Sequence, residues 1–135
     1  MVHLHLFNSC GELYLQKRPA WKDIQPGRWD TAVGGHVDWG EEPLAALRRE
    51  VREEVGVTDF EPQHVLTYLF ESERERELVY VYKTVYDGPV VPSGELDGGR
   101  FWTLREIAEG VGGGIFTPNF EGEIRRVAEL PDVGR

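Results

Sequence analysis

The sequence predicts an α/β (α+β) fold in which helices cover a central mixed β-sheet. β-rich runs stand before and after one central helical pattern, and a second helical pattern lies near the end of the chain. The 135 residues are 40% hydrophobic and 29% charged, which is typical of a globular chain that buries a core without a disulfide or a metal. No repeat, low-complexity segment or linker divides the chain, so we expect one domain over residues 1–135.

The N-terminal third is predicted to contain a hairpin, a loop and a short strand. Residues 2–7 are mostly apolar and residues 12–17 alternate in polarity, with an Asn-Ser-Cys-Gly turn between them. Residues 18–28 contain two prolines and a glycine, which favours a loop. We expect a strand over residues 29–33 that ends at Gly34 and Gly35.

The rest of the chain alternates helix and strand. Residues 42–55 have a helical pattern, with Pro43 in the first turn and Gly56 at the stop. Residues 63–71 and 77–86 are rich in β-forming residues and predict a second hairpin with a charged tip. A strand over 100–103, a helix over 104–109 and a final helix follow, and Thr117 and Pro118 begin that last helix, which we expect to reach about residue 130.

Composition excludes several classes of function. The net charge of −9 argues against general affinity for nucleic-acid polymers or anionic membranes, and no apolar run approaches the roughly 20 residues of a membrane span. The N-terminus has neither a basic leader nor a small-residue cleavage site. Cys10 is the only cysteine, which excludes an internal disulfide and suits a reducing compartment. We therefore expect a cytoplasmic protein.

The charge is unevenly distributed. Residues 1–34 hold four basic and three acidic side chains, so the remaining residues carry a net charge of −10. On a helical wheel of about 100° per residue, Glu50, Glu53 and Glu54 fall within an arc of about 100°. Like charges at this spacing cost a few tenths of a kcal/mol each, unless a hard cation such as Mg²⁺ or Mn²⁺ turns the repulsion into coordination.

The neighbouring positions on the wheel support this interpretation. An apolar side suited to packing on a sheet adjoins the acids and consists of Leu44, Leu47, Val51 and Val55. Ala46 lies on the acidic side, where its small side chain is expected to leave access to the carboxylates. The alternative is a solvated acidic face paired with Arg48, Arg49 and Arg52, which does not account for the flanking glycines or for Ala46.

The segment from Gly35 to Val57 resembles the Nudix box of the Nudix (MutT-like) superfamily, G-x5-E-x7-R-E-U-x-E-E-x-G-U, where U is aliphatic. All defined positions are filled, by Gly35, Glu41, Arg49, Glu50, Val51, Glu53, Glu54, Gly56 and Val57. The resemblance implies a single domain with the Nudix α/β/α sandwich. It also implies divalent-metal-dependent hydrolysis of a diphosphate linkage, commonly in a nucleoside diphosphate joined to another moiety, by attack of water on phosphorus.

The resemblance implies a role for each box residue. The acids Glu50, Glu53 and Glu54, helped by the carbonyl of Gly35, would bind Mg²⁺, with Mn²⁺ as the alternative. Arg49 would orient the acid beside it, and Glu41 would be structural. The implied partner is a small-molecule diphosphate, and a homodimer is compatible with the family.

Residues 1 to about 120 also resemble the Nudix subgroup close to isopentenyl-diphosphate isomerase. The matching residues are Arg18, Lys22, Pro26, Gly27, Trp29, Gly35 and His36. This implies that Arg18 and Lys22 contact substrate phosphates, which would explain the locally basic N-terminal third; solubilising loop charge is the alternative. Flat side chains available for stacking on a substrate are Trp21, Trp39, Phe101 and Trp102, although core burial is equally expected for the last two.

Departures from the isomerase pattern favour hydrolysis. Gly34 stands where the isomerase has its catalytic cysteine, Cys10 lies in the first hairpin turn, and the box acids are intact. His36 matches an isomerase metal ligand but lacks the accompanying histidines, so it is interpreted as a loop residue. A non-catalytic nucleotide-binding sensor and an isomerase-like enzyme acting on prenyl diphosphates remain the rival functions.

Acids and histidines outside the box complete the set of candidates. The family often adds a metal ligand or general base from a later loop, for which Glu95 is the first choice and Asp97 the second. His3 and His5 point to the same side of a predicted strand; they suit a metal pair or an ordinary sheet surface, and the surface is favoured. Acids in the second hairpin (Glu71, Glu73 and Glu75) are expected to maintain solubility.

Overall fold

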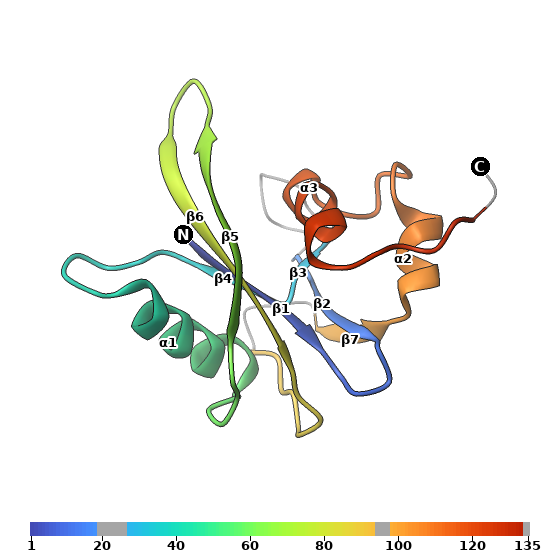
Figure 1. The fold of residues 1–135 in the computed structure, drawn as a ribbon, viewed down its shortest axis with the longest axis horizontal. Helices are drawn as coiled ribbons and strands as arrows, with labels where there is room; N and C mark the ends of the chain where they lie inside the picture. The colour runs from blue at the N-terminus through green and yellow to red at the C-terminus, as the bar shows by residue number, and fades with distance from the viewer. Residues whose placement is uncertain (19–26, 94–97, 134–135) are drawn as a thin grey trace.

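The computed structural model describes residues 1–18, 27–93 and 98–133 (Figure 1). Its elements, in chain order, are β1 Val2–Phe7, β2 Leu13–Lys17, β3 Trp29–Thr31, β4 Val33–Gly35, α1 Pro43–Val55, β5 Gln63–Glu71, β6 Arg76–Val85, β7 Gly99–Trp102, α2 Leu104–Gly110 and α3 Pro118–Val127. None of the described helices combines the length and the apolar character needed to cross a membrane.

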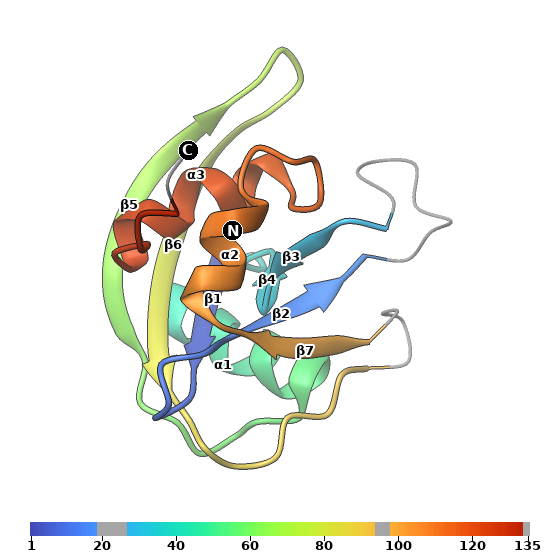
Figure 2. The ribbon, with the colours of Figure 1, turned by 90° about the vertical axis from the view of Figure 1, so that its right-hand side faces the viewer.

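The strands form one mixed sheet, as the sequence predicts. Strand order is β3-β2-β1-β6-β5, with β4 paired to β1 and β7 paired to β2. The β1–β6 pairing is parallel and the other pairings are antiparallel. One half of β1 therefore pairs with β2 and the other half with β4, so β1 lies at the centre of the sheet (Figure 2).

Helices cover both faces of the sheet, which confirms the predicted sandwich. α1 lies against one face, and α2 and α3 lie on the other (Figures 1 and 2). Under α1, the buried side chains of Leu47, Val51 and Val55 pack with Val2 and Leu4 of β1. The opposite core is built from other residues, among them Leu13, Leu15, Trp102, Ile107, Phe116, Phe120 and Ile124. The catalytic candidates on α1 thus lie on a helix anchored by its apolar side.

The boundaries of α1 follow from its end residues. Pro43 occupies the first turn, where its missing N–H costs no hydrogen bond. Gly56 adopts a left-handed conformation with φ of 69° and donates its N–H to the Arg52 carbonyl.

Two expectations from the helical wheel are wrong: Leu44 is 43% exposed, and Ala46 is completely buried. Residues 46, 50 and 54 of α1 face the sheet. Ala46 therefore fills space in the core and does not leave access to the carboxylates.

Two further boundaries differ from the prediction. The single strand expected over 29–33 is divided into β3 and β4, and Gly34 and Gly35 belong to β4 because both pair with β1. α3 ends at Val127 rather than near residue 130, with Ala128 in extended conformation at φ of −150°. Pro131 disfavours helical geometry at the residue before it, which is consistent with the earlier end.

Candidate active site

Gly35 at the end of β4 and two acids of α1 form the centre of the candidate site. A Cβ added at Gly35 would stand 2.2 Å from the carboxyl carbon of Glu50, so only glycine lets this side chain approach the strand. The Glu50 side chain is 16% exposed. Glu54, one turn further along α1, lies beside Glu50 and the N–H of Gly34. Gly34 and Gly35 thus bring the backbone of β4 against Glu50 and Glu54 of α1.

The surroundings of the buried Glu54 carboxyl group do not stabilise a negative charge on it. Burial and the neighbouring Glu50 raise the pKa of Glu54 well above its ordinary value, against the lowering effect of the Gly34 N–H and the Gln16 amide. Its Oε1 lies 3.5 Å from Gln16 Nε2, and its buried Oε2 has no hydrogen-bond partner among the described residues. An unpaired buried carboxylate oxygen is unfavourable unless a proton or a cation supplies the missing partner.

Arg49 connects the loop before α1 to the acids. Its Nε and Nη2 donate to the two oxygens of Glu41 at 3.0 Å each, and Nη1 donates to Glu50 at 2.8 Å. Nη2 also donates to the His36 carbonyl at 3.0 Å and lies 3.4 Å from Asp38. The bonds from Arg49 and from the Asp38 N–H lower the pKa of Glu41 to about 2. The loop that follows Gly35 is therefore fixed relative to α1.

Glu53 occupies a different position from the other two acids. Its side chain is 54% exposed and lies 3.6 Å from Arg49 Nη1. Among the described residues, no three His, Cys, Asp or Glu side chains converge as a ready-made metal site. The structure brings Glu50, Glu54 and Gly35 together and places Glu53 on the solvent side. Hard oxygen donors with one unsatisfied oxygen nevertheless fit a divalent cation.

Arg18 directly follows β2, two residues after Gln16, whose amide contacts Glu54. Its Nη1 lies 3.8 Å from Asp30 Oδ2. The other expected contributors, Trp21, Lys22, Glu95 and Asp97, lie outside the described residues.

The aromatic candidates differ in accessibility. Trp102 is 6% exposed and packs edge-on against Trp29 and Phe116, so it belongs to the core. Phe101 is half-buried against Tyr14. Trp39, in the loop held by Arg49, is fully exposed. Of the stacking candidates within the described residues, only Trp39 is presented entirely to solvent.

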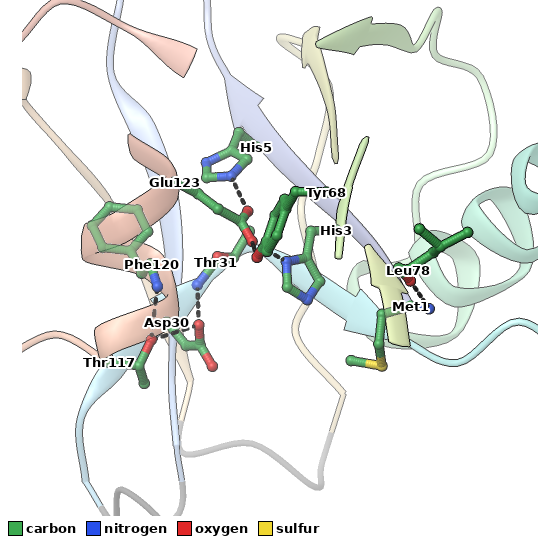
Figure 3. Close-up of polar contacts among 10 residues, drawn as sticks. All are labelled: Met1, His3, His5, Asp30, Thr31, Tyr68, Leu78, Thr117, Phe120 and Glu123. Carbon is green, nitrogen blue, oxygen red and sulfur yellow. Dashed lines mark hydrogen bonds and ion pairs between the residues drawn. The ribbon is translucent and has the colours of Figure 1, made fainter. Parts of the chain in front are cut away.

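The expectation that His3 and His5 form an ordinary sheet surface is wrong, because α3 covers both. Figure 3 shows Glu123 of α3 between the two imidazoles and Tyr68. Glu123 Oε2 lies 2.6 Å from His3 Nδ1 and accepts the Tyr68 hydroxyl at 2.5 Å, while Oε1 lies 2.9 Å from His5 Nε2. Burial opposes ionisation, but the bonds from the histidines prevail and lower the pKa of Glu123 to about 2.

Sequence reasoning missed three contributors to these networks. No sequence pattern marks Gln16 or Asp38 as part of a site, because a polar residue on a strand or in a loop is ordinary. Glu123 does have one: it falls on the apolar stripe of α3 with Phe120, Ile124 and Val127. A lone carboxylate on a buried helix stripe predicts a buried polar partner, here the pair of histidines on β1.

Comparisons with known proteins agree with the box and the fold. A family model described as the NUDIX domain matches residues 1–120. An uncharacterized Nudix hydrolase of Pseudomonas aeruginosa is 36% identical over 97 residues, which cover 71% of this chain and 57% of the relative. An isopentenyl-diphosphate Delta-isomerase of Serratia proteamaculans is 31% identical over 111 residues, covering 78% of this chain and 60% of that enzyme. The chain thus matches less than two thirds of the length of either curated relative.

A solved structure extends the likeness to the whole fold. The crystal structure of DR0079 from Deinococcus radiodurans superposes with a TM-score of 0.79 at 26% identity, covering 93% of this chain and 80% of that chain. The family model, the relatives and this neighbour all agree with the predicted box and sandwich. The chain therefore belongs to the NUDIX domain family.

Proposed function

We propose that this protein is a divalent-metal-dependent diphosphohydrolase that cleaves the diphosphate linkage of a small organic molecule. The observation that carries the proposal is Glu54, which lies beside Glu50 and whose buried Oε2 finds no hydrogen-bond partner in the described part of the chain. A cation at this position would relieve the repulsion between the two carboxyl groups. The family relation supports hydrolysis of diphosphates in general, and the intact box acids support it for this chain.

The described groups receive roles from their positions, and Trp21, Lys22 and Glu95, outside the described residues, keep the roles that the resemblance implies. Glu50, Glu54 and the Gly35 carbonyl would hold Mg²⁺ or Mn²⁺ from the buried side, and Glu53 would join from the solvent side. Arg49 fixes the direction of the Glu50 carboxylate through its 2.8 Å bond. Arg18 would bind substrate phosphate together with Lys22, and Trp21 would contact the organic moiety. Glu95 would serve as the base from the loop before β7.

The chemistry needs charge neutralisation and an oriented nucleophile. A bound divalent cation would lower the pKa of a water molecule and offset the charge that develops on the leaving phosphate. The protein contributes a fixed set of carboxylate directions, because Arg49 and Gly35 restrain Glu50 on two sides. Hydrolysis would consume water and release two phosphate-containing products, one of them the phosphorylated organic moiety.

Isomerisation of a prenyl diphosphate is the second candidate, since several relatives are named as that enzyme. Two features disfavour it. Gly34 offers no side chain at the position that corresponds to the isomerase cysteine. Cys10 is exposed in the β1–β2 turn, at the opposite end of β1 from the His3–Gly34 pair. Formation of dimethylallyl diphosphate from isopentenyl diphosphate would favour this candidate over hydrolysis.

A substrate panel with purified protein tests the proposal. Nucleotide sugars, dinucleotides, nucleoside triphosphates and prenyl diphosphates are incubated with Mg²⁺, Mn²⁺ or EDTA, and the phosphate products are measured. We expect turnover only with a divalent cation and a loss of at least about 100-fold in Glu53→Gln and Glu54→Gln. Glu129→Gln, an exposed substitution beyond α3, serves as the charge-matched control. Activity that survives both box substitutions contradicts the mechanism; tight nucleotide binding without turnover by the intact protein indicates a sensor.

A further inference from the structure

Gln16 of β2 is a buried polar residue that faces the acids of α1. It is 8% exposed and lies on the same side of the strand as Tyr14, which belongs to the core under α1. Its backbone is held from both sides, because Gln16 pairs with Asp30 of β3 and with Gly99 of β7. The strand therefore delivers the Gln16 side chain to a fixed place beside α1.

The Gln16 amide is oriented by a backbone carbonyl. Its Nε2 donates to the Thr31 carbonyl at 3.0 Å and lies 3.5 Å from Glu54 Oε1. Because a carbonyl can only accept, it determines which end of the amide is the NH2 group, and the second N–H of that group is left for Glu54. The 3.5 Å contact is long for a hydrogen bond, and ionisation of the carboxyl group would shorten and strengthen it.

The two oxygens of Glu54 consequently have different surroundings. Oε1 has the Gln16 amide beside it, whereas the buried Oε2 has no hydrogen-bond partner among the residues that the structure describes. A carboxyl group bonded at one oxygen cannot rotate freely, so its other oxygen keeps one direction. A neutral donor suits this position: lysine or arginine would neutralise Glu54 and compete with a cation, and an acid would add to the repulsion from Glu50.

We propose that Gln16 is a positioning residue that binds Glu54 Oε1 and thereby directs Oε2 toward a divalent cation. Arg49 holds Glu50 in the same manner through its 2.8 Å bond, so each of these two acids has one donor that fixes its direction. Partners of this kind are worth about 10- to 100-fold in metal affinity, and a single long bond from a neutral amide belongs at the lower end. The inference rests on the proposed function, because it assumes a cation at Glu54.

Three variants separate positioning from support of the fold. Gln16→Met replaces the amide with an apolar chain of similar length. Gln16→Asn keeps a buried amide, but one methylene group too short to reach the Thr31 carbonyl and Glu54 at once, and it carries the test if Gln16→Met does not fold. Thr84→Val is the matched control, because it also removes a bond from a buried strand side chain to a backbone carbonyl, that of Glu61 at 2.8 Å.

Binding of Mn²⁺ without substrate tests the inference directly. The electron paramagnetic resonance signal of free Mn²⁺ gives the Kd for each protein, and circular dichroism confirms that each is folded. We expect the Kd to rise roughly tenfold in both Gln16 variants and to stay within about twofold of wild type in Thr84→Val, although this control also loses stability. Glu54→Gln sets the upper limit of the loss. An unchanged Kd in both Gln16 variants, an equal rise in Thr84→Val, or a larger loss in Gln16→Met than in Glu54→Gln would overturn the inference.

Kinetics separate this inference from the proposed function. With the best substrate of the panel, the Mg²⁺ concentration for half-maximal rate should rise roughly tenfold in both Gln16 variants, while kcat at saturating Mg²⁺ stays within about threefold of wild type. If no substrate is hydrolysed but Mn²⁺ binding weakens as expected, the proposed function fails and the positioning role of Gln16 stands. If hydrolysis requires a divalent cation and both Gln16 variants bind Mn²⁺ as tightly as wild type, the positioning role fails alone.

Discussion

Arg49 of α1 and Glu41 of the preceding loop form a two-pronged ion pair, with both N···O distances at 3.0 Å. The same guanidinium donates to Glu50 and to the His36 carbonyl, so one side chain joins the loop, the strand end and the helix. A planar group with donors in fixed directions is required to satisfy all of these acceptors at once.

Replacing Arg49 with lysine tests this geometry. Lysine keeps the positive charge but cannot donate in parallel to Glu41 while also binding Glu50. We expect kcat/KM for the best diphosphate substrate to fall about 10- to 100-fold, as for residues that orient metal ligands. Arg52→Lys, on the exposed side of the same helix, is the control and should retain activity. Equal activity of both variants would show that only the charge of Arg49 matters.

Gly35→Ala should separate activity from stability. The added methyl group would overlap the Glu50 carboxylate, which lies at the end of a flexible chain and can move aside. We therefore expect little change in Tm but a large loss of Mg²⁺-dependent turnover. Gly122→Ala is the matched control, because no atom lies within 4 Å of its added Cβ; this helix position should be stabilised by about 0.5–1 kcal/mol. A Gly35→Ala protein with full activity would exclude a close Gly35–Glu50 arrangement in catalysis.

Glu123→Gln should destabilise the fold. Three donors from β1 and β5 converge on this carboxylate, and glutamine offers only one oxygen and adds a donor of its own. We expect a loss of roughly 2–4 kcal/mol in the free energy of unfolding, measured by urea denaturation at pH 7. Glu129→Gln provides the exposed comparison and should stay within about 0.5 kcal/mol of wild type.

The same carboxylate should make stability depend on pH. The pKa of Glu123 is lowered from 4.5 to about 2, so between these values the unfolded state binds a proton that the folded state does not. The contribution of this group is complete above about pH 4.5 and is lost as the pH falls toward 2. Urea midpoints measured from pH 7 to pH 3 should therefore fall more steeply for wild type than for Glu123→Gln. Parallel curves for the two proteins would contradict the assignment.

Local patterns predicted much of this architecture. The Pro43 and Gly56 signals indicated the bounds of α1, and the content of β-forming residues indicated β5 and β6 to within one residue. Helical periodicity placed Glu50 and Glu54 together, but it did not predict that Glu53 lies apart from them on the solvent side of α1. Pairing across the sheet was harder to predict, because Gly34 and Gly35 look like a strand break until β1 is seen to pair with them. His3 and His5 were misplaced for the same reason, since their partner lies 120 and 118 residues away.

The parallel pairing of β1 with β6 has a consequence for how the chain acquires its fold. Val2 pairs with Tyr80, so the central strand of the sheet is synthesised well before β6 and cannot gain this neighbour until residues 76–85 exist. Such contacts between distant segments slow folding. Until then the β6-facing side of β1 exposes unpaired backbone groups, and such edges recruit other chains. A nascent or truncated chain that ends before Arg76 is therefore a candidate for aggregation and for capture by chaperones.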